Sequence, residues 1–125
     1  MSRPAPWLAA LVGVLLVMVA ASADAEPIRI PTASAKYRLA VERAAAEYFG
    51  LEAPSARLAA QLHQESLWNP RASSRFADGL AQFTPATADW LPSVCPELGA
   101  FDPWDAGQAI RGAACYDAWL FQRVQ

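Results

Sequence analysis

An unbroken apolar run at residues 7–21 limits the folding part of this 125-residue chain to the residues C-terminal to it. Arg3 precedes the run and Ala23-Asp24-Ala25 comes after it, which is the charged, apolar and small-x-small order of a secretory signal peptide. The run is shorter than the roughly 20 residues that a membrane-spanning helix needs, although an uncleaved N-terminal anchor is the alternative. We therefore predict a signal peptide at residues 1–25 and one small domain at residues 26–125.

Export sets the expected location and limits the expected partners. We predict a periplasmic or secreted protein, with no stable membrane association once the signal peptide is cleaved. No Cys stands directly after the apolar run, where a lipid would be attached, so a lipoprotein anchor is not expected. The formal net charge is −2 and Lys36 is the only lysine, so we expect no nucleic-acid partner.

The chain has two cysteines, Cys95 and Cys115. In an oxidising compartment a disulfide is the default, with two free buried thiols as the alternative. The bridge would close a loop of about 20 residues and contribute roughly 3 kcal/mol. One His and two Cys make no full ligand set, so we expect no metal and no cofactor.

Two helices are predicted in the first half of the domain. Apolar residues recur at helical spacing from Ala33 to Phe49, and Gly50 stands where a glycine would end that helix. Ser55 then begins a second helix with Leu58 and Leu62 on its inner stripe. We expect it to end at Asn69-Pro70, because the residue before proline is disfavoured in helical conformation.

Two further helices are predicted in the second half. Thr84 is a good N-cap with Pro85 in the first helical position, and this helix should end near Trp90. Asp102-Pro103 should begin the last helix in the same way, with Asp105 as a capping-box partner. Residues 69–79 and 91–101 are predicted loops. No segment alternates like a strand, so we predict an all-α fold.

Glu65 has the features of a general acid. It lies near the end of the second predicted helix, among the apolar residues Leu62, Leu67 and Trp68. Apolar surroundings and the negative end of the helix dipole both disfavour the charged form of a carboxyl group, which would keep a proton available for transfer. The alternative is a solvated carboxylate at a helix end.

A longer motif surrounds Glu65. Glu65-Ser66-Leu67-Trp68-Asn69-Pro70 is followed, in order, by Ala72, Ser74, Gly79-Leu80-Ala81-Gln82 and Pro85-Ala86-Thr87. The order resembles the soluble lytic transglycosylase (SLT) family, whose signature reads Glu-Ser-x-aromatic-Asn-Pro, Ala-x-Ser, Gly-Leu-Met-Gln and Pro-x-Thr-Ala. The resemblance covers about residues 59–120, through Asp102-Pro103 and Ile110-Arg111-Gly112-Ala113. The variant Gln82-Phe83-Thr84-Pro85 is most similar to the phage-associated branch.

The resemblance implies a lysozyme-like helical domain that binds peptidoglycan glycan strands. It implies cleavage of the β-1,4 bond between N-acetylmuramic acid and N-acetylglucosamine, with a 1,6-anhydro product. Glu65 would act first as acid and then as base, so that one carboxylate replaces the usual pair. Ser74 would lie beside the acid. Ser73 could take this place instead, because the loop between Asn69 and Gly79 is one residue shorter than the common pattern of the family. Gln82 would donate to the sugar, with Phe83 and Thr84 in the same substrate-binding stretch.

The absence of one family motif leaves alternatives open. The family continues to an Ala-Tyr-Asn-x-Gly motif that does not occur before Gln125, and Cys115-Tyr116-Asp117 is not that motif. We therefore expect a partial domain, incomplete at its C-terminus, with weak or no activity. A non-catalytic glycan-binding or secretion-assembly protein is one alternative, and a lysozyme-type hydrolase with Asp78 as second carboxylate is another. Partners in a secretion system or in phage lysis would fit. Six aromatic residues could stack on sugar rings, and of these we expect Phe76 and Trp90 to be exposed and most of the others, Trp68, Phe83, Trp104 and Trp119, to be core.

Overall fold

The computed structural model describes residues 32–53 and 55–125. The predicted signal peptide at residues 1–25 lies outside the described residues. No helix within the described residues is long and apolar enough to span a bilayer.

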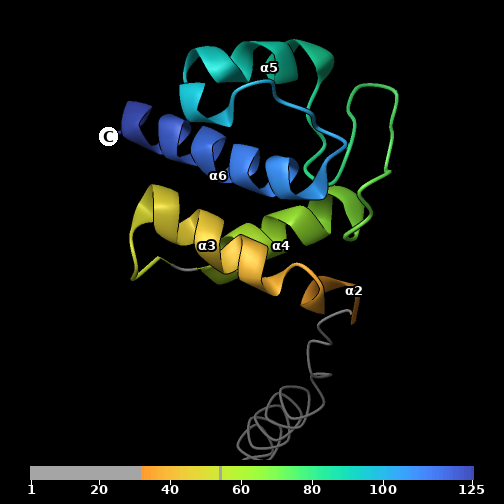
Figure 1. Cartoon of the computed structure of the whole chain (residues 1–125), viewed down its shortest axis with the longest axis horizontal. Helices are drawn as coiled ribbons and strands as arrows, with labels where there is room; N and C mark the ends of the chain where they lie inside the picture. Colours follow the sequence, from red (N-terminus) through yellow and green to blue (C-terminus); the bar gives the residue numbers. More distant parts are fainter. Residues whose placement is uncertain (1–31, 54) are drawn as a thin grey trace, which may run out of the picture. The chain divides into compact units, whose positions relative to one another are not determined.

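The described residues fold as helices around a central C-terminal helix. Helix α6 lies between α5 on one side and the pair α3 and α4 on the other (Figure 1). Extended pairing in the described part of the chain is limited to two isolated bridges, Ser73 with Asp78 and Asp78 with Phe83. The all-α prediction is confirmed. The elements are α2 (Thr32–Ala35), α3 (Arg38–Phe49), α4 (Ser55–Ser66), α5 (Pro85–Trp90), the short 3₁₀ helices η1 (Leu91–Ser93) and η2 (Pro96–Leu98), and α6 (Ala106–Arg123).

The core forms where α3 and α4 meet α6. Small buried residues such as Ala45 on α3 and Ala113 and Ala114 on α6 let these helices approach closely. Leu58 and Leu62 of α4 are buried, as the helical spacing predicts. Leu62 is fully buried, which stabilises the fold by roughly 1.5–3 kcal/mol relative to an exposed leucine.

The first predicted helix, Ala33 to Phe49, is wrong in one respect, because it is two helices. A turn at residues 36–37 separates α2 from α3, and in it the backbone N–H of Tyr37 donates to the carbonyl of Ser34 at 3.0 Å. The Tyr37 ring stacks on Trp68, with 6.1 Å between ring centroids. Gly50 ends α3 as predicted, with φ at 89° and its N–H bonded to the carbonyl of Ala46.

The predicted ends of two other helices are also wrong. Helix α4 ends at Ser66, three residues before Asn69, because Leu67 and Trp68 both adopt positive φ. Helix α6 begins at Ala106, because Asp105 is its N-cap and accepts from the N–H of Gln108 at 2.8 Å. By contrast, the start of α5 is confirmed, since the side chain of Thr84 accepts from the N–H of Thr87.

A disulfide joins Cys95, at the start of η2, to Cys115 on α6. The predicted pairing is therefore present in the structure. Both cysteines are buried, so the bridge ties the connection between α5 and α6 to the middle of the core.

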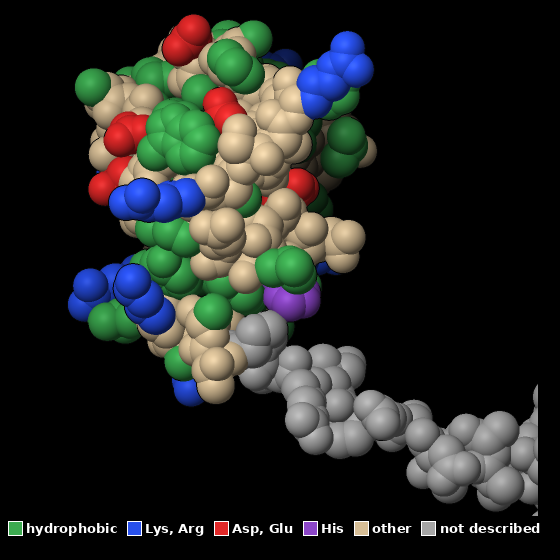
Figure 2. Space-filling model, turned by 90° about the vertical axis from the view of Figure 1, so that its right-hand side faces the viewer, with side chains coloured by type: hydrophobic (Ala, Val, Ile, Leu, Met, Phe, Trp, Pro, Cys, Tyr) green, Lys and Arg blue, Asp and Glu red, His purple; other side chains and the backbone are tan. Residues whose placement is uncertain are grey.

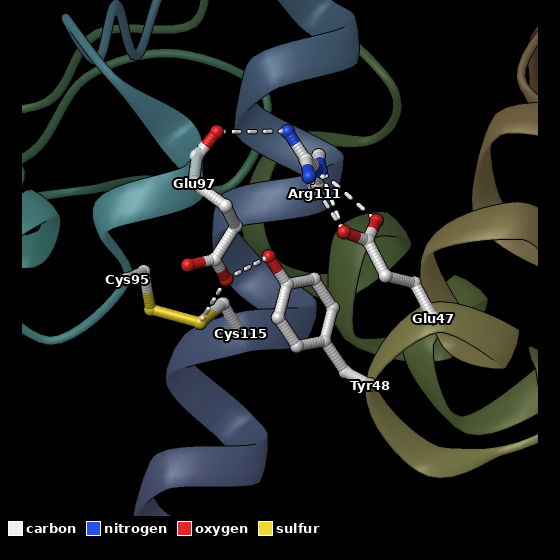
Figure 3. Close-up of a disulfide and its surroundings, with 6 residues drawn as sticks. All are labelled: Glu47, Tyr48, Cys95, Glu97, Arg111 and Cys115. Atoms are coloured by element: carbon white, nitrogen blue, oxygen red, sulfur yellow. Dashed lines mark hydrogen bonds and ion pairs between the residues drawn. A yellow bond between two sulfur atoms is a disulfide. The ribbon is translucent and has the colours of Figure 1, made fainter.

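A polar network beside the disulfide ties α3 to the same place (Figure 3). The Tyr48 hydroxyl donates to Oε1 of Glu97 at 2.6 Å, and burial is the main cause that raises the pKa of this phenol. Arg111 of α6 donates from two nitrogens to the Glu47 carboxylate and from a third to the backbone carbonyl of Glu97. Helices α3 and α6 are thus joined by polar contacts as well as by the core.

Candidate active site

A cleft of about 240 Å³ opens between α4, the start of α5 and α6. Helix α4 contributes Gln61 and Glu65, residues 81–84 form the connecting wall, and Tyr116 reaches the cleft from α6. Four of the predicted site residues therefore meet in one place, namely Glu65, Gln82, Phe83 and Thr84.

Glu65 lies in the last turn of α4, at the negative end of the helix dipole. Its side chain is exposed at the cleft. The expectation that apolar neighbours surround Glu65 is wrong for the free chain. Leu62 and Trp68 turn into the core instead, whereas Leu67 faces solvent with 69% of its surface exposed.

The turn after Glu65 is strained, with φ of 53° at Leu67 and 65° at Trp68. Non-glycine residues in this region cost roughly 1–3 kcal/mol each and persist where the surroundings enforce them. One contact that holds this turn is the packing of Trp68, whose ring is buried and stacks on Tyr37. The N–H of Leu67 also bonds to the carbonyl of His63 at 2.9 Å. The backbone that carries Glu65 is therefore held in place.

Gln82 forms part of the opposite wall and also has positive φ, at 53°. Its side-chain nitrogen Nε2 donates to the carbonyls of Gly79 and Ala72, at 2.8 and 3.1 Å. The sequence predicts Gln82 as a donor to the sugar, but this nitrogen is already used within the protein. The group that Gln82 can offer to the cleft is its amide oxygen.

Gly79 fixes the position of that wall. Its φ is +82°, and a Cβ at this position would lie 1.9 Å from the backbone oxygen of Pro103. The N–H of Gly79 bonds to the carbonyl of Ala72 at 2.8 Å. Only glycine allows this close approach of the wall to the segment before α6.

The two candidate serines lie elsewhere in the same loop. Ser74 closes a local turn, in which its hydroxyl accepts from the N–H groups of Phe76 and Ala77. Ser73 donates to Oδ1 of Asp78 at 2.9 Å. Ser73, Ser74 and Asp78 are not among the residues that line the cleft.

The family comparison agrees with this geometry. The model of the transglycosylase SLT domain matches residues 42–125. The chain belongs to the SLT transglycosylase family. Comparisons with curated proteins and with solved structures give no match to it.

The SLT match spans every residue that lines the cleft, so the cleft lies within the family's domain. The lysozyme-like helical fold that the sequence resemblance implies is confirmed, and peptidoglycan is the substrate class of the family. The SLT domain thus presents one carboxyl group, Glu65, among neutral side chains in the described part of its cleft.

Two cleft residues of this SLT domain are missed by sequence reasoning. Gln61 stands four residues before Glu65, a spacing that places two helical side chains on one face. Tyr116 stands three residues after Ala113, which also lines the cleft. Helical periodicity is sufficient to place both, whereas motif matching passes over them.

An aromatic cluster of the SLT domain continues from Tyr116 toward the end of α6. Trp90 contacts both Tyr116 and Trp119 edge to face, at 6.1 and 4.9 Å between centroids. Trp90 and Phe76 are exposed, as predicted. Trp104 is exposed too, although core was expected for most of the other aromatic residues.

The surface shown in Figure 2 is mixed in charge. Asp and Glu side chains lie in the upper half of that face, and Lys and Arg side chains and hydrophobic side chains lie in both halves. A metal ion could in principle be held by Cys95, Glu97 and Cys115, whose ligand atoms lie within 4.8 Å of one another. Both sulfurs are consumed by the disulfide, so this group does not act as a ligand set.

Proposed function

We propose that this SLT domain is a peptidoglycan lytic transglycosylase with Glu65 as its catalytic acid and base. It cleaves the β-1,4 bond between N-acetylmuramic acid and N-acetylglucosamine and leaves a 1,6-anhydro end. The observation that carries the proposal is the place of Glu65, which faces Gln82, Phe83 and Thr84 across one cleft.

The reaction needs one proton to travel through one carboxyl group. Glu65 gives its proton to the oxygen that links the two sugars, and the bond from that oxygen to the anomeric carbon breaks. The 6-hydroxyl of the muramic acid then attacks the anomeric carbon and returns its proton to Glu65. No water is consumed, so no second carboxylate is needed to activate it.

The surroundings of Asp78 favour this route over hydrolysis. Asp78 accepts from the Ser73 hydroxyl, and its backbone pairs with that of Phe83. Its carboxylate is therefore engaged within the loop and does not line the cleft. Because Glu65 is exposed in the free chain, we infer that the bound glycan covers it and excludes water.

The proposed site of action is the periplasm or the cell exterior. The disulfide between Cys95 and Cys115 supports this, because such bonds persist in oxidising compartments. The signal-peptide pattern at residues 1–25 supports it independently.

The test is digestion of purified cell wall, with the products identified by mass spectrometry. The sequence predicts weak activity for this chain, and the products that the parent chain does release should be anhydro-muropeptides. Glu65→Gln should lower the rate about 10²–10⁴-fold, because it removes the proton donor and keeps the shape. Glu52→Gln, at an exposed carboxylate outside the cleft, is the matched control and should keep the parent rate.

Three results would contradict the proposal. Full activity of Glu65→Gln would show that another group transfers the proton. Products with reducing ends would show a hydrolase. Retention of the chain on cell wall without any release would show a glycan-binding protein.

A further inference from the structure

A hydrogen bond between α4 and α6 lies behind the cleft. Gln61 stands one helical turn before Glu65, and both side chains line the cleft. Nε2 of Gln61 donates to Oδ1 of Asp117 on α6, at 3.2 Å. Asp117 does not line the cleft, and its hydrogen bond to Gln61 links it to a residue that does.

The charge of Asp117 decides which end of the Gln61 amide faces it. Burial is the largest influence on Asp117 and raises its pKa above the ordinary value, and the hydrogen bond from Gln61 and the positive charge of Arg57 offset this rise in part, which favours the ionised form. An ionised carboxylate only accepts hydrogen bonds. A reversed amide would therefore set its own oxygen against a carboxylate oxygen, and the observed orientation is favoured.

This orientation leaves the carbonyl oxygen Oε1 of Gln61 for the cleft. Among the described residues no donor is bonded to it, and the same holds for the amide oxygen of Gln82. Gln61 and Gln82, whose amide oxygens have no donor among the described residues, thus line the cleft together with Glu65. Such oxygens accept from N–H or O–H groups of a ligand.

We propose that Gln61 is a specificity-determining residue, which accepts a hydrogen bond from the acetamido N–H of a sugar bound next to Glu65. Asp117 is the positioning residue that turns the Gln61 oxygen toward that sugar. The inference rests on the proposed function, because both sugars of the proposed substrate carry an acetamido group.

The test measures binding and not cleavage, in chains that carry Glu65→Gln. Two β-1,4-linked tetramers are titrated, one of N-acetylglucosamine and one of glucose, which has hydroxyls in place of the acetamido groups. Gln61→Ala should weaken binding of the acetylated tetramer about 2–10-fold, the range of one net hydrogen bond. Binding of the glucose tetramer should not change.

Matched variants separate recognition from structure. Gln64→Ala, at the neighbouring exposed glutamine that does not line the cleft, should bind both tetramers like the parent. Asp117→Ala should weaken binding of the acetylated tetramer as Gln61→Ala does. Asp117→Asn removes the charge and offers the Gln61 amide both a donor and an acceptor, so it should also weaken binding of the acetylated tetramer and leave the glucose tetramer unchanged.

Some outcomes overturn the inference alone. These are unchanged binding in Gln61→Ala, an equal loss for both tetramers, or binding of the acetylated tetramer by Asp117→Ala that equals that of the parent. Failure of the Glu65→Gln chain to bind the acetylated tetramer would overturn the inference and the glycan-binding cleft together. Cell-wall digestion by the chain with Glu65 intact tests the proposed function separately.

Discussion

Gly79→Ala is the sharpest test of how the cleft wall is built. The change adds one methyl group at a residue with φ of +82°, where the added Cβ would lie 1.9 Å from the backbone oxygen of Pro103. Real Cβ contacts stay above 3.0 Å, so the two backbones must separate by about 1.1 Å. The Gly79 carbonyl is also one of the two acceptors that hold the Gln82 amide.

Two costs add up at Gly79. A non-glycine residue at positive φ costs roughly 1–3 kcal/mol. Forcing a packed contact apart costs roughly another 1–3 kcal/mol. Gly99→Ala is the matched control, because Gly99 also has positive φ, at +61°, but nothing lies within 4 Å of its added Cβ. We expect a loss of about 2–6 kcal/mol for Gly79→Ala and about 1–3 kcal/mol for Gly99→Ala.

Urea unfolding followed by circular dichroism measures both free energies of unfolding. Cell-wall digestion on the folded fraction reports the cleft. Gly79→Ala should lower both stability and activity, whereas Gly99→Ala should lower stability alone. Equal losses of stability in the two variants, with activity kept in both, would refute the reasoning, because the wall would then move away from Pro103 freely.

Two further predictions concern stability away from the cleft. Replacing Cys95 and Cys115 together with alanine should lower the free energy of unfolding by about 3 kcal/mol, since the bridge closes a separation of 20 residues; reduction of the parent chain should give a similar loss in the same urea assay. The hydrogen bond from Arg111 lowers the pKa of Glu47 from its ordinary 4.5, so the pair stabilises the fold above that pH and less as pH falls through the lowered value. Glu47→Gln should therefore cost up to about 1 kcal/mol at neutral pH, because the pair is partly exposed, and the cost should fade in acid; a cost independent of pH would contradict this.

Local signals in the sequence are sufficient for the helices and for some of their ends. Helix α5 begins at Thr84-Pro85 because the Thr84 side chain accepts from the free N–H of Thr87. Helix α3 ends at Gly50 because its N–H bonds to the carbonyl of Ala46 and glycine tolerates the positive φ. The other boundaries depend on distant partners. Helix α4 stops early because Trp68 is drawn into the core against Tyr37, and no local pattern contains that contact.

The site divides in the same way. The motif places Glu65 and Gln82 in one cleft correctly, because the family's spacing encodes the fold. It does not predict that the Gln82 amide bonds to two backbone carbonyls, since this depends on the loop's path. Ser73 and Ser74 are drawn into turns of the loop itself, as short polar side chains often are.

Strain in the described chain is concentrated at the cleft. The non-glycine residues with positive φ in the described chain are Leu67 and Trp68, two and three residues after Glu65, and Gln82, which lines the cleft. Each conformation is held by a partner, whether the buried indole of Trp68 or the two carbonyls that bind the Gln82 amide. A chain selected for stability alone would relax these residues or replace them with glycine. These conformations hold Glu65 and Gln82 in the lining of one cleft, and a fixed geometry of this kind would favour the proton transfer that we propose for Glu65.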